Sequence, residues 1–210
     1  KLVFPDLSEE EAEARMWEEI LACCRVDGGD AIKNWQGHID ELKKHVDILN
    51  GYNFKTLRYK NSAGTDVTVD LPEGHYWEGG SEVAGTGVIF SPNMPTEEVF
   101  TLPERNSMNG TIVSTKPLSH NGHLIEGIVF EVRDGKITEA HADKGEEVLK
   151  DAITVDEGAS YFGEVALVPY DSPISRSGIL FLNTLFDENA SCHFAFGAAY
   201  PCIHGAEHMS

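Results

Sequence analysis

The chain has 210 residues, and its shares of hydrophobic (41%) and charged (24%) residues are those of an ordinary globular domain with a substantial core. Its 35 acidic and 16 basic residues give a formal net charge of −19. Such a charge repels phosphate groups, so nucleic acids and anionic membrane surfaces are excluded as expected partners. No apolar run in the sequence approaches the ~20 residues that a membrane-spanning helix needs.

The first residues and the cysteines predict a cytoplasmic protein. The sequence begins at Lys1 without the apolar stretch of a signal peptide, and a start without Met suggests that upstream sequence is missing. Cys23, Cys24, Cys192 and Cys202 do not have the spacing of a zinc finger, and adjacent cysteines rarely pair with each other. We therefore expect free, reduced thiols.

Two helices are predicted at the start of the chain. Ser8 and Glu11 have the spacing of a capping box, and apolar residues follow at helical intervals. The turn residues Asp27-Gly28-Gly29-Asp30 predict the end of this first helix. A second amphipathic helix is predicted over residues 31–49, with Asn50-Gly51 as its end.

Strand patterns dominate the rest of the chain. Residues 54–59 and 65–71 alternate as strands do, and Asp134-Gly135 predicts a hairpin turn further on. Other strands are predicted over residues 88–90, 99–102, 111–114, 124–132, 136–142 and 163–169, and a short helix over 144–153. The predicted fold class is α+β, with two leading helices followed by a strand-rich mixed-sheet body that carries short helices.

Two acidic segments are candidates for chemistry. Glu97 and Glu98 follow Pro95 and precede an apolar strand, although most such pairs are simply solvated surface residues. Glu164 lies in the otherwise apolar run from Phe162 to Pro169. An ionised carboxylate in that run needs an ion-pair partner, hydrogen bonds or a metal, unless it lies in water at the end of the strand.

A third candidate segment, residues 183–200, is dense in acids, amides, a thiol, an imidazole and a phenol among apolar residues. Buried polar groups at this density need partners, and a metal ion is one such partner. Each residue also has a purely structural interpretation: His193 as a hydrogen-bonded core histidine, and Tyr200 as an ordinary amphipathic core residue. The neighbouring Cys192 is a weak candidate for a thiol nucleophile, because residues adjacent in sequence rarely point at one another.

Two further histidine patterns are less favoured as metal sites. His38-Ile39-Asp40 resembles an HxD pair of ligands, but Ile39 is expected to face the core, which would turn its two neighbours towards solvent. His204 and His208 are four residues apart in a terminal segment in which Gly205 weakens helix formation.

Long sequence blocks carry a family resemblance. The blocks VFPDLSEEEA, TEEVFTLP, STKPLS, KGEEVLK, VDEGASYFGEVALVP and DSPISRSGILFLNTLFDENASCHFAFGAAY, with their spacing, resemble the thermophilic-type metalloaminopeptidases, the M29 peptidase family. The resemblance implies a homodimeric aminopeptidase that acts on peptide substrates through two divalent metal ions. Imidazole and carboxylate ligands suit zinc, cobalt or manganese in such a site.

The resemblance also implies roles for individual residues. The metal ligands carried over are Glu98, Glu164, His193 and Tyr200, with Glu164 as the expected bridge between the ions. The phenol of Tyr200 is an unusual ligand, because its unperturbed pKa is near 10. Glu97 is a candidate general base by analogy with other two-metal aminopeptidases, and Glu188 competes with it for that role.

The resemblance further implies that residues 1–210 are only part of the catalytic domain. The family has an N-terminal domain, and an HxD pair of ligands that would lie beyond Ser210. The leading hypothesis is thus a dinuclear metalloaminopeptidase. The alternatives are a metal-binding or structural piece of such an enzyme that is inactive without the downstream ligands, a pure interaction module, and a thiol hydrolase.

Overall fold

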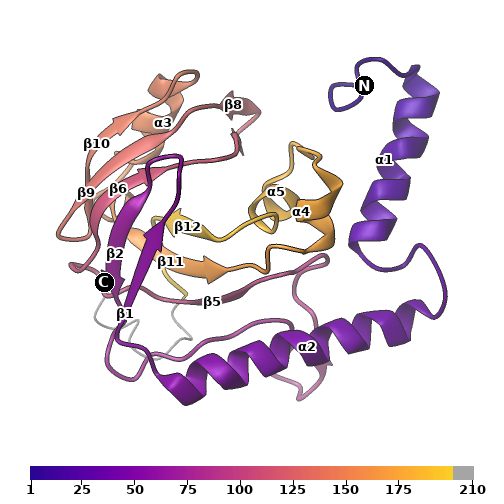
Figure 1. The fold of residues 1–210 in the computed structure, drawn as a ribbon, viewed down its shortest axis with the longest axis horizontal. Helices are drawn as coiled ribbons and strands as arrows, with labels where there is room; N and C mark the ends of the chain where they lie inside the picture. The colour runs from indigo at the N-terminus through magenta and orange to yellow at the C-terminus, as the bar shows by residue number, and fades with distance from the viewer. Residues whose placement is uncertain (201–210) are drawn as a thin grey trace. The chain divides into compact units, whose positions relative to one another are not determined.

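A computed structural model describes residues 1–200 of the chain (Figure 1). The chain divides into two compact units. The first unit comprises Lys1–Ile48, Glu78–Val99 and Leu167–Cys192, and the second comprises Leu49–Trp77, Phe100–Ala166 and the residues from His193 onward. The predicted class is confirmed, because two leading helices are followed by antiparallel sheets and short helices.

The first unit begins with the two predicted helices. Helix α1 spans Glu9–Cys23 and opens with the predicted capping box, in which the Ser8 hydroxyl accepts from the Glu11 amide and the Glu11 carboxylate accepts from the Ser8 amide. Helix α2 spans Ala31–Tyr52 and buries Leu42. It therefore continues through Asn50-Gly51, where the sequence predicted its end.

The side chain of Asn50 explains why it does not end the helix. Its Nδ2 donates to the Trp77 carbonyl at 3.1 Å, and its Oδ1 accepts from the Trp77 amide at 2.7 Å. A side chain committed to another segment no longer competes for the helix backbone, which is how Asn ordinarily favours helix ends and turns.

Two short helices complete the core of the first unit. Helix α4 spans Pro173–Ser177 and helix α5 spans Thr184–Glu188. A cluster of buried side chains forms between them and α1: Cys23, Ile174, Phe181 and Ala190, with Met16, Ile20, Ile179 and Phe186 packed against it. The end of α1 is thereby anchored beside the segment that follows α5.

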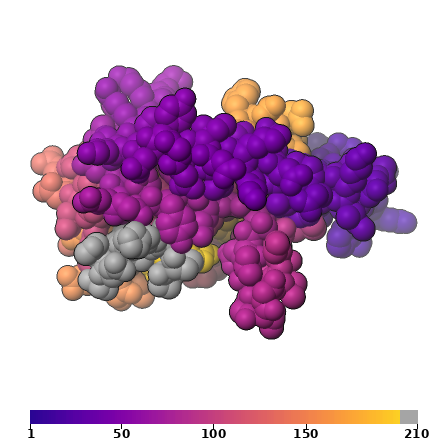
Figure 2. Space-filling model, turned by 90° about the horizontal axis from the view of Figure 1, so that it is seen from below, coloured from indigo at the N-terminus to yellow at the C-terminus, as the bar shows by residue number. Residues whose placement is uncertain are grey.

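A small hairpin also belongs to the first unit. Strands β3 (Glu82–Val83) and β4 (Ile89–Phe90) pair antiparallel. Val83, Val88 and Ile89 are exposed, and the magenta segment that holds the hairpin projects from the surface in Figure 2.

The second unit contains a five-stranded antiparallel sheet in the order β1-β2-β6-β9-β10. Its strands span Thr56–Lys60, Asp66–Asp70, Asn109–Val113, Val129–Arg133 and Lys136–His141. Asp134 and Gly135 both have positive φ, as the predicted hairpin turn requires. Beside this sheet lie helix α3 (Glu146–Ala152) and the hairpin of β7 (Leu118–His120) and β8 (His123–Ile125).

The strand predicted over residues 124–132 is in fact two strands, β8 and β9. Gly127 between them has a φ of +66°, a left-handed conformation that interrupts an extended chain. Glu126 there pairs instead with Lys144, which precedes α3.

A three-stranded sheet has the order β12-β11-β5, formed by His193–Phe196, Phe162–Leu167 and Val99–Thr101. Strand β11 is the predicted apolar strand around Glu164, and most of its residues are buried. Across residues 1–200, the helices are too short or too polar to cross a membrane.

Candidate metal centre

The pairing of β11 with β12 brings Glu164 and His193 to one face of their sheet. Ala166 lies directly opposite His193 in the antiparallel register, and Glu164 lies opposite Ala195. Residues opposite each other, and residues two apart on one strand, project from the same face. Glu164 and His193 are therefore diagonal neighbours on that face, within reach of each other's polar atoms.

The side chains meet as this register requires. His193 Nε2 lies 3.5 Å from Glu164 Oε1, and their side chains are 15% and 16% exposed. A carboxylate that is largely withdrawn from water beside an imidazole retains its charge only with compensation from a proton on the ring or from a cation. This pair is the geometric centre of the candidate site.

Glu98 completes a group of three possible ligands. It is buried and immediately precedes β5, which belongs to the same sheet as β11 and β12. One ligand atom each from Glu98, Glu164 and His193 lie within 4.8 Å of one another. Two carboxylates and one imidazole are donors that suit zinc, cobalt or manganese, so these residues fit a divalent ion.

Glu97, the predicted general base, is buried against a cation. Its Oε1 and Oε2 accept hydrogen bonds from Nη1 and Nη2 of Arg25, at 2.6 and 2.9 Å. The Glu97 side chain is 2% exposed. Both carboxylate oxygens are thus engaged by one guanidinium, the strongest arrangement for an ion pair of this kind.

The prediction that His38 turns towards solvent is wrong. Its Nε2 lies 2.6 Å from the carbonyl oxygen of Thr96, and the side chain is 9% exposed. Burial lowers the pKa of His38 below its usual value. The helix buries a wider stripe than Ile39 alone indicates, so His38 lies inside, while Asp40 is exposed and accepts from Gln36.

The roles of the other predicted site residues stay predictions. Tyr200 is about half exposed, and its ring lies 5.7 Å from that of Phe100. Glu188 is half-buried at the end of α5. The alternative ligands His204 and His208 lie outside the described residues.

Sequence reasoning missed Arg25 and Asn189. Asn189 is fully buried, and its Oδ1 accepts from the Glu97 amide at 2.7 Å. Neither residue belongs to a periodic pattern or a ligand-like spacing, and they lie 72 and 92 residues from Glu97. The only available signal was the polar density of the segment that contains Asn189.

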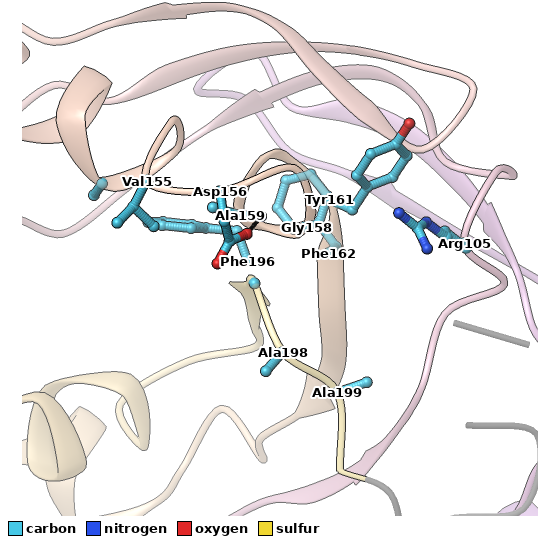
Figure 3. A pocket seen from close by; sticks show the side chains of 12 residues that line it. Arg105, Val155, Asp156, Gly158, Ala159, Tyr161, Phe162, Phe196, Ala198 and Ala199 are labelled. Atoms are coloured by element: carbon cyan, nitrogen blue, oxygen red, sulfur yellow. Dashed lines mark hydrogen bonds between the residues drawn. The ribbon is translucent and has the colours of Figure 1, made fainter. Parts of the chain in front are cut away.

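A cavity of about 380 Å³ lies in the second unit, at the far end of β12 from His193 (Figure 3). Its walls include Phe162 and Phe196, and Arg105 lies with its guanidinium carbon 4.6 Å from the centre of the Tyr161 ring. The lining does not include the three possible ligands.

Comparison with known proteins identifies the family of this chain. The profile of the family described as "Thermophilic metalloprotease (M29)" matches residues 1–210. The chain belongs to this family.

Similar proteins are aminopeptidases. Aminopeptidase AmpS of Bacillus subtilis (strain 168) is 49% identical over 209 residues, which are 99% of this chain and 51% of that protein. Aminopeptidase 2 of Geobacillus stearothermophilus is 48% identical over 199 residues, 95% of this chain and 48% of that protein. The solved structure of wild-type AmpT from Thermus thermophilus matches 98% of this chain and 50% of its own length, with a TM-score of 0.89 and 45% identity. The chain thus spans about half the length of the relatives that it matches.

Proposed function

We propose that this chain supplies part of the metal site of an aminopeptidase, which removes N-terminal residues from peptides. The observation that supports this most directly is the convergence of Glu98, Glu164 and His193, whose ligand atoms lie within 4.8 Å of one another. Family membership supports peptide hydrolysis as the reaction, because the similar proteins of known activity are aminopeptidases.

The proposed site holds two divalent ions of zinc, cobalt or manganese. Glu98, Glu164, His193 and Tyr200 are the proposed ligands, and Glu164 is the proposed bridge. When bound, such ions supply Lewis acidity and a water nucleophile that is active at neutral pH. The chain's own contribution is to fix the donor atoms, since Glu164 and His193 project from one rigid sheet face.

The ion pair between Arg25 and Glu97 bears on which residue is the general base. Transfer of a proton to Glu97 would neutralise the anion in a buried ion pair whose Nη–Oε distances are 2.6 and 2.9 Å. This geometry favours a supporting role for Glu97 and leaves Glu188 as the proposed base. Glu188 is the half-buried last residue of α5, five positions before His193.

The proposal also includes the binding partners and the cellular compartment. The partners are peptide substrates and a second copy of the chain, and the compartment is the cytoplasm. Part of the net charge of −19 would attract the positively charged amino groups of peptides.

A second candidate function is a metal-binding piece without activity. The chain spans half the length of its relatives, and the resemblance places two further ligands, an HxD pair, downstream of Ser210. Loss of two ligands from a site shared by two ions removes both attraction for the ions and coordination geometry. On this basis the 210-residue chain alone is expected to bind at most one ion tightly.

Calorimetric titration with zinc, beside an assay on a leucine amide, separates the candidates. One tight site without turnover supports the incomplete metal site. Two tight sites with turnover support a complete catalytic site within these 210 residues, and would require ligands from His38, Asp40, His204 or His208 to be reconsidered. Absence of zinc binding would overturn the proposed metal site.

A further inference from the structure

We propose that the ion pair between Arg25 and Glu97 is a positioning device for the proposed metal ligand Glu98. The inference rests on the proposed metal site, and it gives the two neighbouring glutamates different roles. Glu98 presents its carboxylate to the ion, while Glu97 anchors the backbone that carries Glu98.

The anchor is a two-point contact. Arg25 donates from Nη1 and Nη2 to the two carboxylate oxygens of Glu97, and the same Nη1 lies 3.3 Å from the carbonyl oxygen of Cys23. A planar guanidinium bound through two parallel hydrogen bonds fixes both the distance and the orientation of its partner. Cys23 belongs to the buried cluster of the first unit. Arg25 therefore fixes the position of Glu97 relative to that cluster.

Two other elements hold the same short segment. His38, on α2, places Nε2 2.6 Å from the Thr96 carbonyl oxygen. Asn189, directly after α5, accepts from the Glu97 amide through Oδ1 at 2.7 Å and donates through Nδ2 to the Leu185 carbonyl at 2.9 Å. Three separate elements of the first unit therefore converge on the two residues immediately before Glu98.

The backbone of Arg25 supports a specific role for its side chain. Arg25 has a φ of +60°, the left-handed region that non-glycine residues rarely adopt. Such conformations persist where the surrounding structure requires them, and they concentrate at functional sites. Glycine would relieve the backbone at this turn but would remove the guanidinium that reaches Glu97.

The inference is testable, because a role through charge and a role through position predict opposite effects of losing Arg25 on cation binding. If the pair acted only through charge, its removal would leave Glu97 as an additional anion beside the site and would strengthen cation binding. If the pair acts by position, the uncompensated Glu97 carboxylate leaves its buried location and displaces Glu98, which weakens binding. We expect the second effect to dominate, because the Glu97 side chain is 2% exposed.

The experiment measures zinc affinity of the 210-residue chain by competition with a fluorescent chelator at pH 7.5. R25M is expected to weaken zinc binding roughly 10- to 100-fold, the range for residues that orient metal ligands. E97Q is expected to weaken it to a similar degree, and the R25M/E97Q double variant no further than R25M, because both changes break one interaction. R25K, which retains the charge but loses the two-point contact, is expected to fall between the wild type and R25M.

Arg58 supplies the matched control. It makes a two-point contact through Nε and Nη2 with Asp66, at 2.9 and 3.0 Å, and the two side chains are 59% and 44% exposed. R58M is expected to leave zinc affinity within about twofold of the wild type. Thermal unfolding of each metal-free variant identifies those that remain folded at the titration temperature, and if R25M does not fold, R25K and E97Q decide the question.

The outcomes separate the two proposals. If the wild type binds zinc and folded R25M binds equally well or more tightly, the positioning role is overturned while the metal site stands. An equal loss of affinity in R58M would also overturn it, since the effect would then be general. If the wild type does not bind zinc at all, the proposed site and the positioning role both fail.

Discussion

Two histidine–glutamate pairs among the described residues of the second unit differ in exposure and in their sequence separation. His193 and Glu164 lie 3.5 Å apart on adjacent strands, and their side chains are 15% and 16% exposed. His141 and Glu146 are also in contact, but they lie at the end of β10 and the start of α3, and their side chains are 65% and 32% exposed. Among residues 1–200, the first pair belongs to a group with a third possible ligand, Glu98, and the second pair does not.

The difference shows what distinguishes a candidate metal site from a surface ion pair. Glu146 is satisfied by neighbours close in sequence: Lys150, one helical turn away, the Ala142 amide at 3.1 Å, and His141. These contacts are local in sequence and are screened by water and salt. The pair of Glu164 and His193 requires two strands that are 29 positions apart to be paired in one register, so its geometry depends on the tertiary structure.

Substitution of Glu164 is expected to have the largest effect on zinc affinity. Glu164→Gln keeps the side-chain shape but removes the anionic donor, and we expect zinc affinity to fall by about 100-fold or more, beyond the usual effect of residues that only orient ligands. In the longer protein, the release of N-terminal residues from short peptides should fall in parallel. The exposed Glu157 on the approach to the same strand provides the control, and Glu157→Gln should leave both quantities within about twofold. Small and equal effects of the two substitutions would exclude Glu164 as a ligand.

The two histidines give the next largest contrast. His193→Gln removes an imidazole donor next to Glu164, and we expect zinc affinity to fall by more than the roughly 10-fold minimum for residues that only orient ligands, but by less than in Glu164→Gln, because Glu164 is the proposed bridge between the ions. His141→Gln changes a pair that is exposed to solvent, and it should leave zinc affinity unchanged within about twofold. A larger loss in His141→Gln than in His193→Gln would place the zinc site at His141 and Glu146 instead of at His193 and Glu164.

Local features of the fold were predictable from the sequence, because they depend on neighbours in the chain. The capping box of Ser8 and Glu11 and the turn at Asp134-Gly135 both appear where predicted. The end of α2 and the break at Gly127 were not predictable in this way. Both depend on partners remote in sequence, namely Trp77 for Asn50 and Lys144 for Glu126.

The candidate site also contains residues that could be named from the sequence and residues that could not. Glu98, Glu164 and His193 were named from their motifs, and their roles as ligands stay predictions, although the structure brings the three together. Arg25 and Asn189 could not be named, because a single arginine after a helix and a single asparagine in a polar segment have many ordinary uses. Their significance arises only when burial and distance show that both contact Glu97.

The cysteines extend the contrast between buried and exposed groups, with a smaller expected effect on function. Burial raises the pKa of Cys23 to about 12 and also raises the pKa of Cys24, so neither forms appreciable thiolate at pH 8. Cys192 is exposed. We expect iodoacetamide to modify Cys192 in the folded chain while Cys23 and Cys24 react only after unfolding, as measured by mass spectrometry of peptides. A thiol hydrolase would lose its activity on this treatment and keep it in a chelator, whereas a metalloaminopeptidase would lose its activity in the chelator.

The smallest expected effect concerns the partly exposed carboxylate of Glu146. Its hydrogen bond from Lys150, and those from the Ala142 amide and His141, lower its pKa from 4.5 to about 2. A carboxylate whose pKa is lowered on folding stabilises the folded state above its unfolded pKa, and this contribution disappears as the pH falls through the folded pKa. Glu146→Gln should therefore lower the thermal midpoint slightly at pH 6, and the difference from the wild type should shrink between about pH 4.5 and pH 2. Because the side chain is partly exposed, at 32%, added salt should reduce the difference at pH 6 as well. Thermal unfolding of both proteins across this pH range measures the effect, and a difference that grew on acidification would show that Glu146 stabilises the fold in its protonated form instead.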